Sequence, residues 1–403
     1  IQPFAAIRPS PEHAAGIAAV PYDVVDTDEA RALAAGNPDS FLHVSRPEID
    51  LPPDCDPHDD EVYRQGARSL RRLMEQRKLI HDSQSGFYVY RQVMGDHAQT
   101  GLVACCHIDD YAADIIRKHE KTRQDKEDDR TRHALTLRAN TGPVFLTYRD
   151  RGELDELTRE ACAGAPLYDF VAEDGVRHVV WRVIHRNDGW IEAGARIPLA
   201  YVADGHHRAK AAYRAGRELR AAHPDAGEAA PWNWFLCVLF PASHLRILPY
   251  NRCVADLNGQ TPERFLELVR RRFNVVEAGD GTPAGPRRTH MYLGGRWFEL
   301  SWEAFKGDPV AMLDVSVLQD RLLQPLLGIN DPRTDGRISF VGGIRGTRAL
   351  VESVHEGKAA AAFSMHPVTV EQMIAIADAG QIMPPKSTWF EPKLRSGLLV
   401  HAL

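Results

Sequence analysis

Apolar residues repeat along the chain with the two periods that distinguish strands from helices. The spacing of Val62, Leu70 and Leu73 predicts an amphipathic helix within residues 59–80. Alternating or continuous apolar stretches predict strands at residues 87–93, 101–108, 143–148, 178–184, 199–203, 234–240 and 245–248. Strands that alternate with helices in this way indicate an α/β fold of the mixed α+β kind, with mixed β-sheets and flanking helices.

The pattern changes after residue 258. Thr261 is suited to cap a helix that starts at Pro262, and Gly294-Gly295 between two apolar stretches predicts a hairpin. Further helices and a strand are expected at residues 315–327, 368–379 and 337–341. We therefore expect an N-terminal α/β region that contributes to the site, a central region and a C-terminal α+β lobe, at residues 1–150, 151–258 and 259–403.

Composition and charge argue against several classes of protein. The formal net charge is −6 and no basic patch stands out, whereas proteins that grip nucleic acid or anionic membranes are normally basic. The longest apolar runs are strand-sized, well short of the roughly 20 residues that cross a bilayer. The six cysteines form no C-x-x-C pair, which favours reduced thiols over disulfides or a zinc ribbon. We expect a cytoplasmic protein that binds small molecules, and neither nucleic acid nor membrane; the sequence does not set its oligomeric state.

The strongest chemical signal lies at the end of the predicted strand at residues 199–203, and a helix that Gly216 is expected to end follows it. The string there is Asp204-Gly205-His206-His207-Arg208, called the 204–208 turn below. A helix N-terminus offers unpaired N–H groups and the positive end of the helix dipole, and both suit an anion. Histidines add donors, and arginine can hold phosphate oxygens with two parallel hydrogen bonds. The turn therefore predicts a site for a phosphorylated ligand.

Other interpretations of this turn stay open. Asp204 can act only as a helix cap, with the histidines solvated, or it can hold a metal ion or accept a proton. His206 and His207 can also form a zinc pair, although helical ligand pairs are usually spaced i,i+4.

A charged segment at residues 117–133 is the second candidate. Runs of this kind commonly form a solvated helix face. The functional interpretation assigns His119 and Glu120 to acid–base or metal chemistry, and places Lys121 or Arg130 against phosphate.

Two more segments carry weaker signals. Residues 340–348 contain a Gly-rich turn that matches neither the P-loop nor the dinucleotide fingerprint, so a tight turn is the simpler interpretation. Residues 382–393 are rich in proline, and Lys386 and Ser387 either line a site or belong to a structural clasp. No nucleophile elbow, H-E-x-x-H helix or kinase H-R-D set occurs, which argues against the common hydrolases and protein kinases.

Several of these segments together resemble one family. Residues 201–208, residues 119–122 and residues 383–398 resemble domain-of-unknown-function family 1015, and Pro21-Tyr22-Asp23-Val24 fits the same pattern. The 204–208 turn also resembles the phosphate-binding turn of the ParB/sulfiredoxin superfamily, whose free-serine kinases carry the same Asp-Gly-His-His-Arg string. Sulfiredoxins have a reactive cysteine where this chain has His206, which argues against their activity here.

The second resemblance implies a ParB/sulfiredoxin-like central lobe that binds ATP or ADP with Mg²⁺. Asp204 would orient Mg²⁺ or accept the proton of an attacking hydroxyl, and the phosphates would be held by Gly205, His206, His207 and Arg208. The implied activity is a nucleotide-dependent phosphotransferase acting on a small hydroxylated metabolite, similar to a free serine kinase. The alternatives are a non-catalytic nucleotide-binding regulator and a metal-dependent hydrolase that uses His119, Glu120, His206 and His207.

Overall fold

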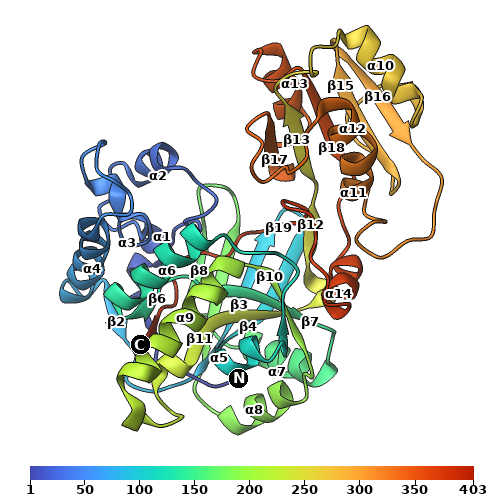
Figure 1. The fold of residues 1–403 in the computed structure, drawn as a ribbon. Helices are drawn as coiled ribbons and strands as arrows, with labels where there is room; N and C mark the ends of the chain where they lie inside the picture. The colour runs from blue at the N-terminus through green and yellow to red at the C-terminus, as the bar shows by residue number, and fades with distance from the viewer. The chain divides into compact units, whose positions relative to one another are not determined.

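The computed structural model describes residues 1–403, which form two compact units (Figure 1). The first unit comprises residues 1–245 and 392–403, and the second comprises residues 246–391. This division differs from the three regions expected from the sequence. The reason is that strands from the first two regions share one sheet, and that the C-terminal segment belongs to the first unit.

An eight-stranded mixed sheet is the centre of the first unit. Its strand order is β5-β10-β7-β11-β4-β3-β9-β8. The strands are β3 (Phe87–Met94), β4 (His97–His107), β5 (Ile116–Arg117), β7 (Val144–Tyr148), β8 (Tyr168–Val171), β9 (Arg177–Val183), β10 (Ala200–Asp204) and β11 (Trp234–Pro241). The pairs β5–β10 and β7–β11 are parallel and the other pairs are antiparallel. The predicted α/β class with mixed sheets is confirmed.

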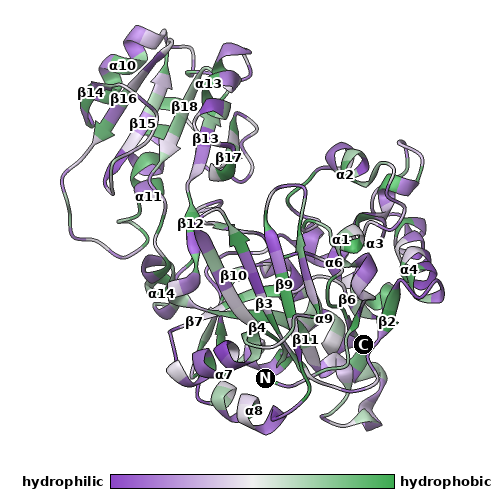
Figure 2. Ribbon diagram, turned by 180° about the vertical axis from the view of Figure 1, so that it is seen from behind, coloured by the Kyte–Doolittle hydropathy of each residue, from purple (hydrophilic) through white to green (hydrophobic).

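Helices contribute to the apolar core of this sheet. They are α5 (Ile108–Ala112), α7 (Gly152–Cys162), α8 (Asn187–Ala195) and α9 (His206–Ala222). Leu154 of α7, Trp190 of α8 and Ala209 of α9 are buried with strand residues such as Phe87 and Phe235. Figure 2 shows hydrophobic colour along strands such as β3 and hydrophilic colour on outer helices such as α7. Burial of this face is the main driving force for the unit, because apolar area removed from water dominates folding.

A second core lies under the N-terminal helices. These are α1 (Ala14–Ile17), α2 (Thr27–Ala34), α3 (Leu42–Ser45), α4 (Asp60–Glu75) and α6 (Gln124–Leu137), which lies beside α9. Two short sheets complete this part, formed by β1 (Ile7–Pro9) with β2 (Leu79–His81) and by β6 (Ala139–Asn140) with β20 (His401–Ala402). Phe41, Leu73 and Leu137 are buried together with Val400, so the C-terminal segment is part of this core.

The second unit contains a six-stranded antiparallel sheet in the order β14-β16-β15-β18-β13-β17. Its strands are β13 (Tyr250–Val254), β14 (Asn274–Ala278), β15 (Arg288–Leu293), β16 (Arg296–Ser301), β17 (Ile338–Gly342) and β18 (Ala361–Met365), with β12 (Arg246–Leu248) pairing β19 (Trp389–Glu391). Its helices are α10 (Pro262–Arg270), α11 (Asp314–Leu318), α12 (Gln324–Leu327), α13 (Arg348–His355) and α14 (Val370–Asp378). The predicted Thr261 cap and Gly294-Gly295 hairpin are confirmed.

Two helix boundaries expected from the sequence are wrong. Helix α9 continues through Gly216 to Ala222. A Cβ at Gly216 would lie 2.3 Å from the Trp232 carbonyl oxygen, so the glycine allows close packing and does not end the helix. The helix expected within residues 59–80 ends at Glu75, and residues 79–81 form strand β2.

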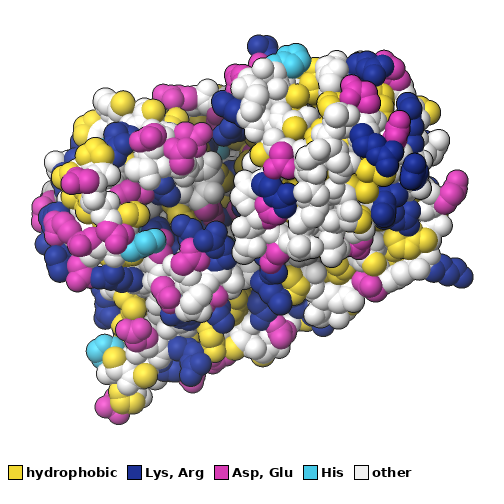
Figure 3. Space-filling view, turned by 45° about the horizontal axis from the view of Figure 1, so that its top comes forward, with side chains coloured by type: hydrophobic (Ala, Val, Ile, Leu, Met, Phe, Trp, Pro, Cys, Tyr) yellow, Lys and Arg dark blue, Asp and Glu magenta, His cyan; other side chains and the backbone are white.

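The surface carries charges of both signs. On the face in Figure 3, Lys and Arg side chains are interspersed with Asp and Glu side chains. None of the helices has the length and apolar character needed to cross a membrane.

Candidate functional site

The parallel pairing of β5 and β10 brings the two candidate segments together. Ala200 and Tyr201 lie opposite Ile116 and Arg117, so both strands end at the same edge of the sheet. The segment with His119 and Glu120 follows β5, and the 204–208 turn follows β10. Two segments more than 80 residues apart in the sequence therefore meet at one edge, as the sequence hypothesis required.

Gly205 makes the change from strand to helix. Its φ of 88° and ψ of 34° lie in the left-handed region, which glycine adopts without strain. A Cβ here would lie 2.9 Å from the guanidinium carbon of Arg208. Because glycine has no side chain to cap the helix, the first N–H groups of α9 receive no cap from this position.

His119 and His206 form a buried pair beside this helix start. Their ring centroids are 4.5 Å apart and the rings meet edge to face. The residues are only 1% and 4% exposed. Nε2 of His206 has no hydrogen-bond partner in the protein, and the His119 nitrogens have none of good geometry, since the contact of this ring with the Val202 backbone is weak. Buried polar groups are normally paired, so these nitrogens mark a place where a ligand would supply partners.

Burial also sets the charge state of the pair. It lowers the pKa of both imidazoles, to about 3 for His119 and about 3 for His206. Nδ1 of His206 lies 3.7 Å from Oε2 of Glu120. At neutral pH the rings are therefore uncharged, and they offer hydrogen bonds to a ligand and no positive charge of their own.

Asp204 is the centre of a charged cluster. Nη2 of Arg208 lies 2.9 Å from Oδ2 of Asp204 and 3.7 Å from Asp23, and Nζ of Lys393 lies 3.6 Å from Oδ1 of Asp204. Burial opposes ionisation of Asp204, but the charges of Lys393 and Arg208 outweigh it and hold its pKa below the usual value. Asp204 is thus a stable carboxylate and a weak proton acceptor.

Arg208 is engaged inside the protein. Besides Asp204, its guanidinium donates to the carbonyl of Pro143, and its side chain is 8% exposed. The sequence predicted that Arg208 binds phosphate directly. In the structure its guanidinium instead binds Asp204 and the Pro143 carbonyl just before β7. Arg208 is better described as a positioning residue for the turn.

The remaining candidates are distributed around this centre. Nε2 of His207 accepts a hydrogen bond from the Arg123 backbone N–H (3.1 Å). Lys121 has an exposed side chain. Arg130 directs its guanidinium to Asp129 at 2.8 Å and belongs to a different set of contacts.

The donor groups that the structure brings together decide which metal ions could bind. The chain contains no cluster of three or more His, Cys, Asp or Glu side chains arranged to hold a metal ion. His119, Glu120, His206 and His207 therefore do not form the zinc site that the hydrolase alternative requires. A single carboxylate such as Asp204 is compatible with Mg²⁺ that takes its other ligands from substrate phosphates and water.

Two residues of this site were not predicted. Lys393 and Asp23 both lie in segments that carry sequence signals, yet nothing in their spacing places them near Asp204 and Arg208. Their contacts depend on the return of the C-terminal segment to the first unit.

Comparisons with known proteins give one family and several distant structures. The model of the family described as "Protein of unknown function (DUF1015)" matches residues 1–316. A free serine kinase mutant in complex with AMP has 11% sequence identity and a TM-score of 0.37, over 74% of this chain and 92% of that chain. A conserved hypothetical protein from Pyrococcus furiosus has 11% identity and a TM-score of 0.37, over 74% and 94%. SbnI with a C-terminal truncation, from Staphylococcus aureus, has the same identity and score, over 74% and 86%. No curated protein matches the chain.

Proposed function

Because this chain belongs to the DUF1015 family of proteins of unknown function, we propose its activity from the site itself: a nucleotide-dependent phosphotransferase acting on a small hydroxylated metabolite. One observation carries the proposal. Buried imidazole nitrogens of His119 and His206 without protein partners lie beside the uncapped start of a long helix. This combination suits the oxygens of a phosphate group.

In this proposal most of the hydrogen bonds to the phosphate come from uncharged donors. The N–H groups of the first turn of α9 and Nε2 of His206 would donate to phosphate oxygens. Lys393, next to Asp204, would supply positive charge. His207 and Lys121 stay in the proposal as residues at the rim, and Arg208 would hold the turn in shape.

Asp204 would act as a carboxylate that stays ionised. With Arg208 and Lys393 lowering its pKa, it is suited to hold Mg²⁺ together with phosphate oxygens, where the ion would neutralise charge during transfer. It is poorly suited to accept a proton. Glu120, 3.7 Å from His206, is the better candidate for the base.

The reaction balances with these groups. The acceptor hydroxyl oxygen forms a bond to the terminal phosphorus, and the bond from that phosphorus to its bridging oxygen breaks. The hydroxyl proton passes to Glu120, and ADP or AMP leaves according to whether ATP or ADP is the donor. Positioning and charge neutralisation supply most of the catalysis in such transfers.

A transfer assay tests this function. The protein is incubated with ATP or ADP, Mg²⁺ and a panel of small alcohols, hydroxy acids and hydroxylated amino acids including serine, and phosphorylated products are measured. We expect product with at least one acceptor, and an Asp204→Asn rate lower by roughly 10²–10³-fold, the usual effect of removing one electrostatic contact to the transition state.

The exposed Asp188→Asn on α8 is the matched control and should keep the wild-type rate. Tight nucleotide binding with no product from any acceptor would contradict the phosphotransferase hypothesis and favour the non-catalytic nucleotide-binding regulator. An Asp204→Asn rate equal to that of the wild type would refute the site assignment.

A further inference from the structure

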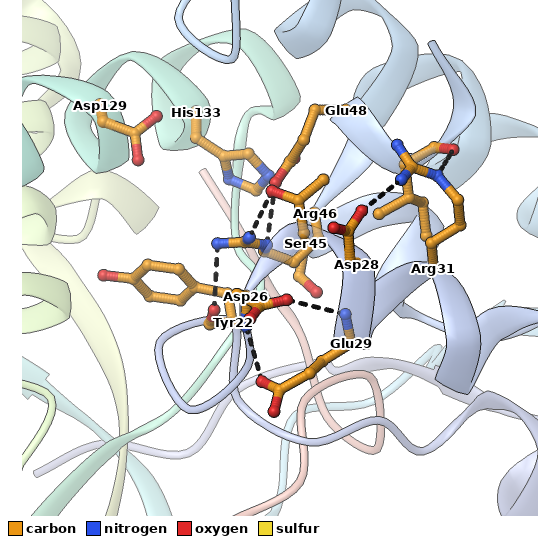
Figure 4. Close-up of polar contacts among 12 residues, drawn as sticks. Tyr22, Asp26, Asp28, Glu29, Arg31, Ser45, Arg46, Glu48, Asp129 and His133 are labelled. Carbon is orange, nitrogen blue, oxygen red and sulfur yellow. Dashed lines mark hydrogen bonds and ion pairs between the residues drawn. The ribbon is translucent and has the colours of Figure 1, made fainter. Parts of the chain in front are cut away.

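A cavity of about 40 Å³ lies in the first unit, and Arg208 is one of its lining residues. Figure 4 shows Tyr22, Ser45 and His133, three other lining residues, close together from the N-terminal segment, α3 and α6. Arg46 donates to the carbonyl of Tyr22 (3.4 Å), which ties this segment to the end of α3. The cavity is thus built from elements that other contacts already hold in place.

Two buried donors in its wall have no partner in the protein. They are Oγ of Ser45 and Nε of Arg208. Ser45 is 4% exposed and the Arg208 side chain is 8% exposed. Nη1 and Nη2 of Arg208 reach Pro143 and Asp204, so Nε is the nitrogen of this lining residue that lacks a partner. A buried donor left unpaired is unfavourable, and two at one cavity indicate a ligand with two acceptor oxygens.

The charged groups at the cavity are paired within the protein. Arg130 and Arg208 both line it, Arg130 is paired with Asp129 at 2.8 Å, and Arg208 is paired with Asp204 at 2.9 Å. His133 contacts the Val44 carbonyl through Nε2 (2.9 Å), and burial lowers its pKa to about 4, so it is uncharged at neutral pH. The case for an acceptor ligand therefore rests on the unpaired donors, and the wall contains two guanidinium groups and no negative side chain.

Another part of the wall is apolar. Ala134, Val144, Ala212, Phe235 and Leu236 form it, while Asn140, Thr141 and Ser396 add polar groups. The apolar part suits the hydrocarbon portion of a small organic acid, which inorganic phosphate lacks.

We infer that this cavity binds a small carboxylate, with its two oxygens at Ser45 and Arg208 and its carbon atoms against the apolar wall. The inference goes beyond the proposed function, because it does not require that the 204–208 turn binds a nucleotide. Arg208 belongs to both places: it lines the cavity, its Nε has no partner in the protein, and its other guanidinium nitrogens hold Asp204 and Pro143.

Thermal unfolding of the full chain in the absence of nucleotide tests the inference. The probes are acetate, glycolate and L-lactate, with inorganic phosphate and chloride at matched ionic strength. We expect at least one carboxylate to raise Tm in proportion to its occupancy, and chloride to have no such effect. Phosphate can raise Tm through the proposed site at the 204–208 turn, and such a rise should be the same in Ser45→Ala as in the wild type. Ser45→Ala should lower the affinity for that carboxylate at least tenfold, while its own Tm without ligand stays equal or rises, because an unpaired buried hydroxyl is removed.

A second variant narrows the space and leaves the Ser45 hydroxyl and the Arg208 guanidinium in place. A Cβ at Gly142 would lie 3.2 Å from Oγ of Ser396 and 3.6 Å from Cδ of Arg208, so Gly142→Ala should also lower carboxylate affinity. Gly152→Ala, where a Cβ meets nothing within 4 Å, and the exposed Ser83→Ala are the matched controls and should respond like the wild type.

The inference is overturned if no carboxylate raises Tm, if Ser45→Ala weakens a phosphate effect as much as a carboxylate effect, or if Ser45→Ala and Gly142→Ala both respond like the wild type. If a carboxylate raises Tm but no nucleotide binds, the result would support this inference and contradict the proposed function.

Discussion

At the scale of single residues, burial determines what the candidate site can do. Histidines at a helix start suggest positive charge for an anion, but burial keeps His119 and His206 uncharged at neutral pH. The carboxylate of Asp204 is instead stabilised by Lys393 and Arg208. The sequence predicted which residue types lie at this turn, but their charge states depend on desolvation and on distant partners that spacing does not encode.

The buried histidines predict acid sensitivity. An unfolded histidine has a pKa near 6.5, whereas the pKa of folded His119 is about 3. Between these values the unfolded chain binds more protons, so the free energy of unfolding falls as pH falls below 6.5, by about 1.4 kcal/mol per pH unit for each such histidine.

Urea unfolding at pH 7, 6 and 5 measures this effect. His119→Gln should reduce the slope between pH 6 and pH 5 by about 1.4 kcal/mol per pH unit, and the exposed His185→Gln should leave it unchanged. An unaltered slope in His119→Gln would mean that His119 is not held uncharged by burial.

At the scale of elements, helix α9 shows why glycine is ambiguous in a sequence. Gly205 permits a left-handed backbone at the helix start, whereas Gly216 lies inside the helix where another backbone passes close by. Local sequence predicts the first role from the neighbouring strand. It cannot predict the second, because Trp232 comes from a different part of the chain.

Substitution of helical glycines separates these roles. Gly216→Ala would place a Cβ 2.3 Å from the Trp232 carbonyl oxygen and should destabilise the protein by about 1–3 kcal/mol. Gly189→Ala in α8 meets nothing within 4 Å and should be neutral or stabilise by up to about 1 kcal/mol, the usual gain for alanine in a helix. Equal effects of the two changes in urea unfolding would show that close packing is not the reason for Gly216.

At the scale of the whole molecule, strands were more predictable than their assembly. Apolar stretches located β3, β7, β9 and β11 to within a residue or two, because the buried residues of each strand are close together in the sequence. The order of the eight-stranded sheet and the return of residues 392–403 to the first unit were not predicted, since both depend on long-range pairing. The sequence predicted the 204–208 turn and residues 119–120 as parts of one site, and the structure brings them together, whereas the contacts of Lys393 and Asp23 and the cavity beside Arg208 depend on the folded chain.

Binding of a nucleotide phosphate at the 204–208 turn underlies the proposed function, and calorimetric titration with ADP and ATP in Mg²⁺ measures it. His206→Phe keeps an aromatic ring against His119 but removes the donor nitrogens, and the exposed His185→Phe is its control. We predict binding to the wild type and the control. In His206→Phe the binding free energy should be weaker by about 1.5–3 kcal/mol, the contribution of a hydrogen bond to a charged group. Absent binding, or equal affinity in His206→Phe, would contradict the claim.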